Sequence, residues 1–375
     1  MRPEQRTEVI NIYRQRYVGF GPTLAAEKFG EHEGKVLSKE TLRQLLIGSG
    51  DRQRGRKRST HRQWRARKEQ LGMLVQLDGS HHDWFERRRE ECVLMAYIND
   101  ATSQIYARFY EYEGTIPAMD SLQRYIKKHG MPMRLYVDKH STYKFPLNEP
   151  DIYDEDGNPV EGKSQFERAV EELGIQMSHA HSPQAKGRIE RLFGTLQDRL
   201  VKEMRLAGIN SLEEANRFLP KYLERHNKRF MVAGTAQGDM HRPLPKRNDL
   251  NRILCIKTER TVKNDNTISL DSKLYQLHET LAGWKVRVEE RVDGTMRIVN
   301  QDKSIRHHEI TKRPRKVKPQ TVQISKSKAH KPAADHPWIG ALFGKKALPQ
   351  KTGFVGCRII RTFLLCRNQD ISILP

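Results

Sequence analysis

The chain has 375 residues, which is long enough for two or three domains that each bury a core. Lysine and arginine total 68 against 46 aspartates and glutamates, and the resulting formal charge of +22 favours a nucleic-acid partner, because neutralising phosphates releases counterions. The 4 cysteines form no CxxC pair, so we expect neither a disulfide scaffold nor a zinc finger. No apolar run approaches the ~20 residues of a membrane span, so we do not expect a membrane protein. We expect a soluble cytoplasmic protein without a signal peptide.

Residues 1–50 have a helical pattern. Pro22 suits the first turn of one short helix, and Ser38 can cap another that Gly48 would end. Two short helices separated by a tight turn indicate a helix-turn-helix DNA-binding region. An ordinary helical hairpin explains this segment equally well when it is considered alone.

Residues 51–69 form a basic segment that is too polar to bury a core, which predicts a linker or arm. Its position directly after the helical region favours an arm that follows DNA phosphates over a simple solvated charge run. The candidate DNA contacts in this linker are Arg54, Arg56, Lys57 and Arg58.

Residues 70–206 alternate between strand and helix patterns in the order strand, strand, strand, helix, strand, helix, strand, helix. The second and third strands are expected to pair antiparallel, and an exposed acidic insertion is expected at about 145–163. This order predicts an α/β domain with helices packed on a mixed sheet, continuing helically to about residue 232.

The remaining sequence predicts two further regions. Short strand patterns at hairpin spacing, with turn signals at Asn266 and Gly294, predict a small β-barrel over residues 250–312. Residues 313–375 are basic and poor in apolar side chains, which predicts a disordered tail.

Three acids occupy positions where the metal ligands of a phosphodiester-cleaving site could lie. Asp78 and Asp138 follow the buried runs LVQL and RLYV, so neighbouring strands could aim both at one point. Glu190 lies one position away from the apolar stripe of a predicted helix, where it could lean over the sheet edge. Carboxylates are the hard ligands that Mg²⁺ prefers. The residues alone leave open that both aspartates are turn residues and that Glu190 forms a surface ion pair with Lys186.

The segments QLDGSHHDWF, HGMPMRLYVD and SPQAKGRIERLFGTLQDRL together resemble the integrase core of DDE transposases. The likeness is greatest to bacterial insertion-sequence transposases of the ISNCY type, and it covers about residues 15–320. It implies a ribonuclease-H-like core, an N-terminal helix-turn-helix that binds terminal repeats, and a small C-terminal β-barrel. It also implies that Asp78, Asp138 and Glu190 are catalytic and hold Mg²⁺ or Mn²⁺, with two ions expected.

Two features depart from the family pattern. Asp138 and Glu190 are 52 residues apart, which is longer than is common among integrase-type enzymes, and the acidic insertion accounts for the excess. Such transposases often have more DNA-binding helices upstream, so we expect a shortened start. The patternless residues 351–375 are consistent with an altered reading frame.

The sequence therefore predicts a DDE transposase that binds the terminal inverted repeats of an insertion sequence, cleaves them and joins them to target DNA. We expect a homo-oligomer on double-stranded DNA, associated with the nucleoid when bound. A DNA-binding protein without catalysis and a nuclease that never joins strands are the alternatives. Further candidate phosphate contacts are Lys186, Arg188 and Arg191, whereas Trp84 and the histidines near the motifs are expected mainly to pack or to be exposed.

Overall fold

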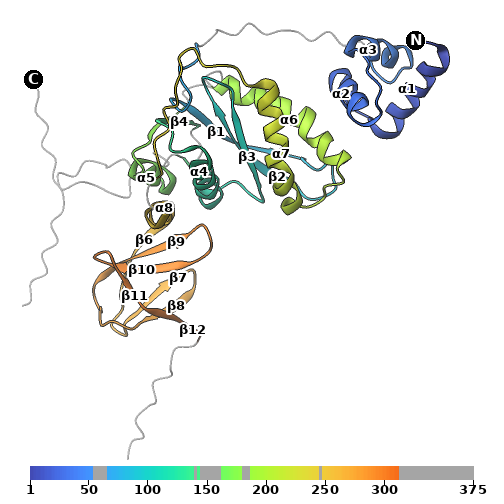
Figure 1. Cartoon of the computed structure of the whole chain (residues 1–375). Helices are drawn as coiled ribbons and strands as arrows, with labels where there is room; N and C mark the ends of the chain where they lie inside the picture. Colours follow the sequence, from blue (N-terminus) through green and yellow to red (C-terminus); the bar gives the residue numbers. More distant parts are fainter. Residues whose placement is uncertain (54–65, 139–141, 144–161, 180–185, 245–246, 312–375) are drawn as a thin grey trace, which may run out of the picture. The chain divides into compact units, whose positions relative to one another are not determined.

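The computed structural model describes residues 1–53, 66–138, 142–143, 162–179, 186–244 and 247–311 (Figure 1). The four basic linker residues from Arg54 to Arg58, most of the predicted insertion and the whole of the predicted disordered tail lie outside these ranges. Across the described ranges, no helix combines the length and apolar character needed to cross a membrane.

The N-terminal region is formed by three helices, α1 (Pro3–Arg16), α2 (Pro22–His32) and α3 (Lys39–Gly48). The Ser38 hydroxyl accepts a hydrogen bond from the Thr41 backbone N–H at 3.0 Å, which is the cap that the sequence predicts. The helices share a core of their own, and helical structure is confirmed here. That this region is a helix-turn-helix that binds DNA remains a prediction. Its buried residues are Val9, Tyr13, Tyr17, Phe20, Leu24, Ala25, Phe29, Leu42 and Leu46.

A mixed five-stranded sheet lies at the centre of the next region. Its spatial order is β3-β2-β1-β4-β5, in which β1 pairs antiparallel with β2 and parallel with β4. β2 and β3 are antiparallel neighbours, and β4 and β5 are parallel. The predicted mixed sheet and the predicted antiparallel pair are confirmed. The strands are β1 (Val75–His82), β2 (Cys92–Asn99), β3 (Ile105–Tyr110), β4 (Arg134–Val137) and β5 (Gln176–His179).

Strand β1 continues beyond the point that the sequence predicts. We expected it to end at Asp78, but residues up to His82 remain paired with β2, where His82 lies opposite Cys92. The polar run Gly79–His82 hides this extension in the sequence, because the cross-strand hydrogen bonds that hold it are made by the backbone.

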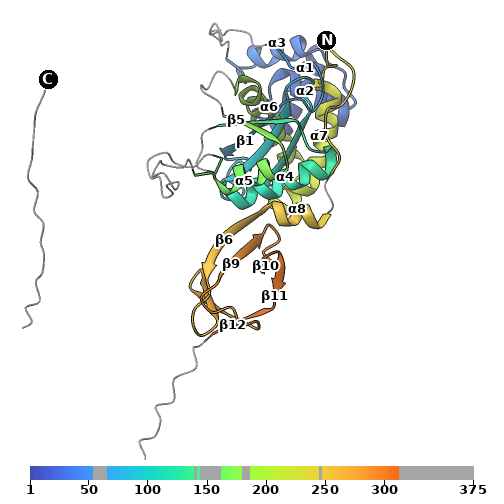
Figure 2. The same ribbon diagram turned by 90° about the vertical axis from the view of Figure 1, so that its left-hand side faces the viewer.

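Helices cover both faces of this sheet (Figures 1 and 2). α4 (Thr115–His129) and α5 (Gln165–Glu172) pack on the face that carries Val75 and Leu77. α6 (Gly187–Leu206) and α7 (Leu212–Phe230) contribute to the core on the opposite face, with Leu94 and Ala96 of β2. The apolar stripe that the sequence predicts beside Glu190 is buried, and it consists of Ile189, Leu192, Phe193, Leu196 and Leu200.

Gly130 ends α4 and starts the turn into β4. Its φ is +92°, in the region that favours glycine, and a Cβ at this position would lie 2.9 Å from the backbone oxygen of Arg242. The close approach is fixed by paired backbone hydrogen bonds between Met131 and Arg242. This turn sets where β4 begins, and with it the position of Asp138 at the other end of the strand.

The predicted small β-barrel is not confirmed. The described strands form one sheet of order β11-β10-β9-β6 and a second of order β12-β8-β7, around a shared core that includes Ile268, Val288 and Ile298. The first residues of the predicted barrel belong to α8 (Arg247–Ile253). The turn signals are confirmed, with positive φ at Asn266 and Gly294. The strands are β6 (Cys255–Thr261), β7 (Thr267–Leu270), β8 (Lys273–Leu277), β9 (Lys285–Arg291), β10 (Met296–Asn300), β11 (Lys303–Ile305) and β12 (His307–Ile310).

Candidate active site

Asp78 lies in the middle of β1, opposite Ala96 of β2. Successive side chains of a strand alternate between faces, so Asp78 shares a face with Gln76 and Ser80, the face on which α6 packs. Its side chain is 19% exposed. Burial raises the pKa of Asp78 to about 6, and the nearby charges of Asp138 and Glu113 add to this shift while the Lys186 ammonium opposes it. The carboxyl therefore lies in a partly desolvated place next to other charges, as catalytic carboxyls often do.

Asp138 directly follows β4 and lies beside Asp78. The parallel register pairs Val75 with Leu135 and Gln76 with Tyr136, and continuing it by two residues sets Asp138 level with Asp78. The backbone oxygen of Asp138 accepts a hydrogen bond from Nδ1 of His179 at 3.1 Å, which fixes the chain at the end of β4. The predicted adjacency of the two strands is confirmed.

One ammonium group contacts both aspartates. Lys186, immediately before α6, places Nζ 2.8 Å from Oδ1 of Asp78 and 3.7 Å from Oδ2 of Asp138. Its side chain is 7% exposed, which is unusual for lysine and is accounted for by these two partners. The sequence predicts Lys186 as a DNA contact or as a partner of Glu190. The structure instead places it between the two predicted metal ligands.

Glu190 lies in the first turn of α6, one helical turn after Lys186, and it is exposed. Four residues further on, Gly194 leaves that side of the helix open, since a Cβ there would meet nothing within 4 Å. Among the described residues, no three His, Cys, Asp or Glu side chains converge closely enough to hold a metal ion. The structure thus brings Asp78 and Asp138 together, and it places Glu190 on the helix that begins beside them.

Divalent metal ions fit the chemistry of the two aspartates. Both groups offer hard carboxylate oxygens, and together they already hold a cation, the ammonium of Lys186. The position between them is therefore one where positive charge is stabilised.

The sequence analysis did not identify Glu113, a further acid beside Asp78. Glu113 follows β3, and its side chain is 10% exposed. A Cβ on Gly79, the neighbour of Asp78, would lie 2.7 Å from the Glu113 carboxyl carbon, so this glycine makes room for the carboxylate. Oε2 of Glu113 lies 3.2 Å from Nε2 of His81. The sequence signal was an acid between a strand and a helix, as for Asp138.

The other predicted residues near the motifs occupy distinct environments. Arg188 lies inside the domain, 2.8 Å from Asp100, whereas Arg191 is exposed on α6. Trp84 is fully buried against Phe109, which confirms the expectation of core packing. Contacts of Lys186, Arg188 and Arg191 with DNA remain predictions. His140 and His181 lie outside the described residues.

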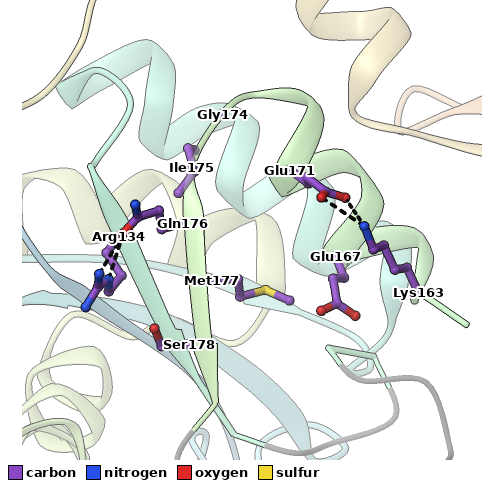
Figure 3. Close-up of a pocket in the computed structure, with 9 residues that line it drawn as sticks. All are labelled: Arg134, Lys163, Glu167, Glu171, Gly174, Ile175, Gln176, Met177 and Ser178. Carbon is purple, nitrogen blue, oxygen red and sulfur yellow. Dashed lines mark hydrogen bonds and ion pairs between the residues drawn. The ribbon is translucent and has the colours of Figure 1, made fainter. Parts of the chain in front are cut away.

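A pocket of about 490 Å³ lies between α5 and the edge strand β5 (Figure 3). Two interactions join residues that line it. Lys163 forms an ion pair with Glu171, and Arg134 donates a hydrogen bond to Gln176. Neither Asp78 nor Asp138 lines it. One of its lining residues, Glu167, places Oε1 3.7 Å from Nε2 of His179, the residue that donates to the backbone oxygen of Asp138.

Two curated transposases are similar to this chain in sequence. The chain is 38% identical over 328 residues to the putative transposase y4bF of Sinorhizobium fredii, and the alignment covers 83% of this chain and 70% of that protein. The chain belongs to this family of transposases. It is also 28% identical over 286 residues to the transposase for insertion sequence IS1202 of Streptococcus pneumoniae. That alignment covers 73% of this transposase and 59% of its relative. No protein-family model matches the chain.

Solved structures with a similar chain course are retroviral integrases. The catalytic core domain of HTLV-2 integrase, in complex with magnesium, is 14% identical with a TM-score of 0.32, covering 44% of this transposase and 92% of that chain. A chain of a simian T-cell lymphotropic virus intasome in complex with PP2A regulatory subunit B56 gamma is 16% identical with a TM-score of 0.34. The alignment covers 70% of this transposase and 88% of that chain. These scores are too low to support the family assignment, which rests on the sequence relatives.

Proposed function

We propose that this transposase cleaves the ends of an insertion sequence and joins them to target DNA by metal-dependent chemistry at Asp78, Asp138 and Glu190. The observation that carries the proposal is the convergence of two strand-borne aspartates on one cation at the start of the helix that bears Glu190. The similarity to transposases supports the class of reaction, and the positions of these residues support the location of the active site.

Each residue has a separate part in the proposed site. Asp78 and Asp138, held by adjacent parallel strands, would bind one divalent ion between them, and Glu190 would complete the set from α6. Mg²⁺ or Mn²⁺, two ions in all, would activate the attacking water or 3′-hydroxyl and stabilise the leaving oxygen. Arg191 is exposed close to Glu190 and is placed to hold a phosphate of the bound strand.

The remaining parts of the chain would bring DNA to this site. The three N-terminal helices and the basic linker would bind the terminal inverted repeats, as the net charge of +22 favours. Because both ends of an element are joined in one reaction, we expect the active form to be a homo-oligomer assembled on double-stranded DNA. We expect it to act in the cytoplasm at the nucleoid.

The test is to incubate the full chain and Mn²⁺ with a duplex that carries the element's ends, and to separate nicked from joined products. Asp138→Asn should abolish both products and leave binding to the terminal repeats nearly unchanged. Asp198→Asn, at an exposed position on α6, is the matched control and should retain both. Cleavage by the Asp138→Asn protein would contradict the assignment of this residue.

The same assay distinguishes the two alternatives. A DNA-binding protein without catalysis would retain the duplex and produce neither product. A nuclease would produce nicked duplex and never a joined strand. Joined products that require Mg²⁺ or Mn²⁺ are expected only of a strand transferase.

A further inference from the structure

Lys186 carries a positive charge that is almost fully enclosed by protein. A buried ammonium is strongly destabilised unless it is paired, and here the pairing is with Asp78 at 2.8 Å and Asp138 at 3.7 Å. The residue is fixed in place because it directly precedes the first turn of α6, whose apolar stripe is buried against the sheet. The ammonium is therefore a built-in part of the site.

The ammonium and a divalent ion bound between the aspartates would both be held by the same two carboxylates. Mg²⁺ binds such oxygens at about 2.0–2.1 Å, which is inside the hydrogen-bond distance that Lys186 keeps to Asp78. Two cations held by the same pair of carboxylates would also repel each other in a poorly solvated place. We therefore expect an entering ion to weaken or break at least one of the two contacts of Lys186.

We propose that Lys186 is an internal counter-ion that holds Asp78 and Asp138 together in the metal-free transposase and is displaced when the first divalent ion binds between them. This rests on the proposed function, which makes the two aspartates metal ligands. In the metal-free state the ammonium offsets the repulsion between the carboxylates, and after displacement it is a free donor one helical turn from Glu190. Lys186 is thus a positioning residue that sets how tightly the metal is held.

The inference makes metal affinity the decisive measurement. Losing the lysine removes a competitor, so Lys186→Met should bind Mn²⁺ about tenfold to a hundredfold more tightly than the wild-type chain in calorimetric titration without DNA, the range expected for one charge-assisted hydrogen bond. Without metal, the same variant should melt at a lower temperature than the wild type, and Mn²⁺ should raise its melting temperature by more.

A matched control is available on the same helix. Lys202 is an α6 lysine whose side chain is 14% exposed, and it pairs with Asp198. Lys202→Met therefore removes one positive charge from α6 without removing a partner of Asp78 or Asp138. Its Mn²⁺ affinity should equal that of the wild type. Lys186→Gln keeps a hydrogen-bond donor without the charge and provides a second variant if the methionine chain does not fold. It should also bind Mn²⁺ more tightly than the wild type.

The outcomes separate this inference from the proposed function. If Asp78→Asn and Asp138→Asn leave Mn²⁺ binding unchanged, the metal site itself is wrong. If those substitutions abolish binding while Lys186→Met and Lys186→Gln bind Mn²⁺ with wild-type or weaker affinity, the site stands and the counter-ion inference is overturned. The inference is supported if the Lys186 variants bind Mn²⁺ more tightly than the wild type and the Lys202→Met control does not.

Discussion

Arg188 and Asp100 form a buried ion pair that ties the start of α6 to the sheet. Nη1 of Arg188 lies 2.8 Å from Oδ1 of Asp100, whose side chain is fully buried. Asp100 follows β2, and its carboxylate also accepts hydrogen bonds from Gln76 of β1 and from the backbone N–H of Lys68. Since Arg188 lies between Lys186 and Glu190, this pair fixes the helix turn on which the candidate site depends.

Replacing Arg188 should therefore reduce stability. Arg188→Met leaves a carboxylate buried without its guanidinium, and we expect a loss of about 3–5 kcal/mol in the free energy of unfolding. Urea denaturation of the full chain measures it. Arg191→Met, exposed on the same helix, should change stability by no more than about 0.5 kcal/mol. Equal stability of the two variants would show that the pair does not anchor α6.

Much of the core arrangement can be predicted from the sequence, because it is encoded locally. Alternating strand and helix patterns give the element order, and the buried stripe of α6 places Glu190 at its border. The motif acids point to β1 and β4 as the strands of the candidate site, and their adjacency follows once both acids are required to meet.

What could not be predicted depends on contacts between distant segments. Asp100 and Arg188 are 88 residues apart, and although Arg188 lies in a quoted motif, nothing in the sequence pairs it with Asp100. Lys186 looks like a helix-surface residue until the fold places Asp78 beside it. The small C-terminal barrel is not confirmed, because hairpin spacing shows that strands pair and does not show how the described strands divide into two sheets.

His226 should make stability depend on pH. This α7 residue packs against Tyr222 and Phe230, and burial, with a further contribution from Arg199, lowers its pKa from 6.5 to about 4. A histidine with a depressed folded-state pKa is protonated first in the unfolded chain. Stability is thus present above pH 6.5 and is lost as the pH falls from 6.5 towards 4. Between pH 7 and pH 5 we expect His226 alone to cost about 2 kcal/mol.

The measurement is urea denaturation at pH 7 and pH 5 for the wild type and His226→Gln. The variant should lose about 2 kcal/mol less than the wild type over this interval, whatever its stability at pH 7. His32→Gln, at an exposed position, should behave like the wild type. An unchanged pH dependence in the His226 variant would place the acid sensitivity elsewhere.

Glu190→Gln should separate catalysis from stability. Glu190 is exposed in the first turn of α6, where a carboxylate gains about 0.3–1 kcal/mol from the helix dipole. If it is a metal ligand, the variant should form neither nicked nor joined products with Mn²⁺ and element ends, while its unfolding free energy falls by no more than about 1 kcal/mol. Glu224→Gln, on the exposed surface of α7, should retain both products. Strand transfer by the Glu190 variant at the wild-type rate would remove Glu190 from the site, leaving the two aspartates as the only protein ligands proposed here.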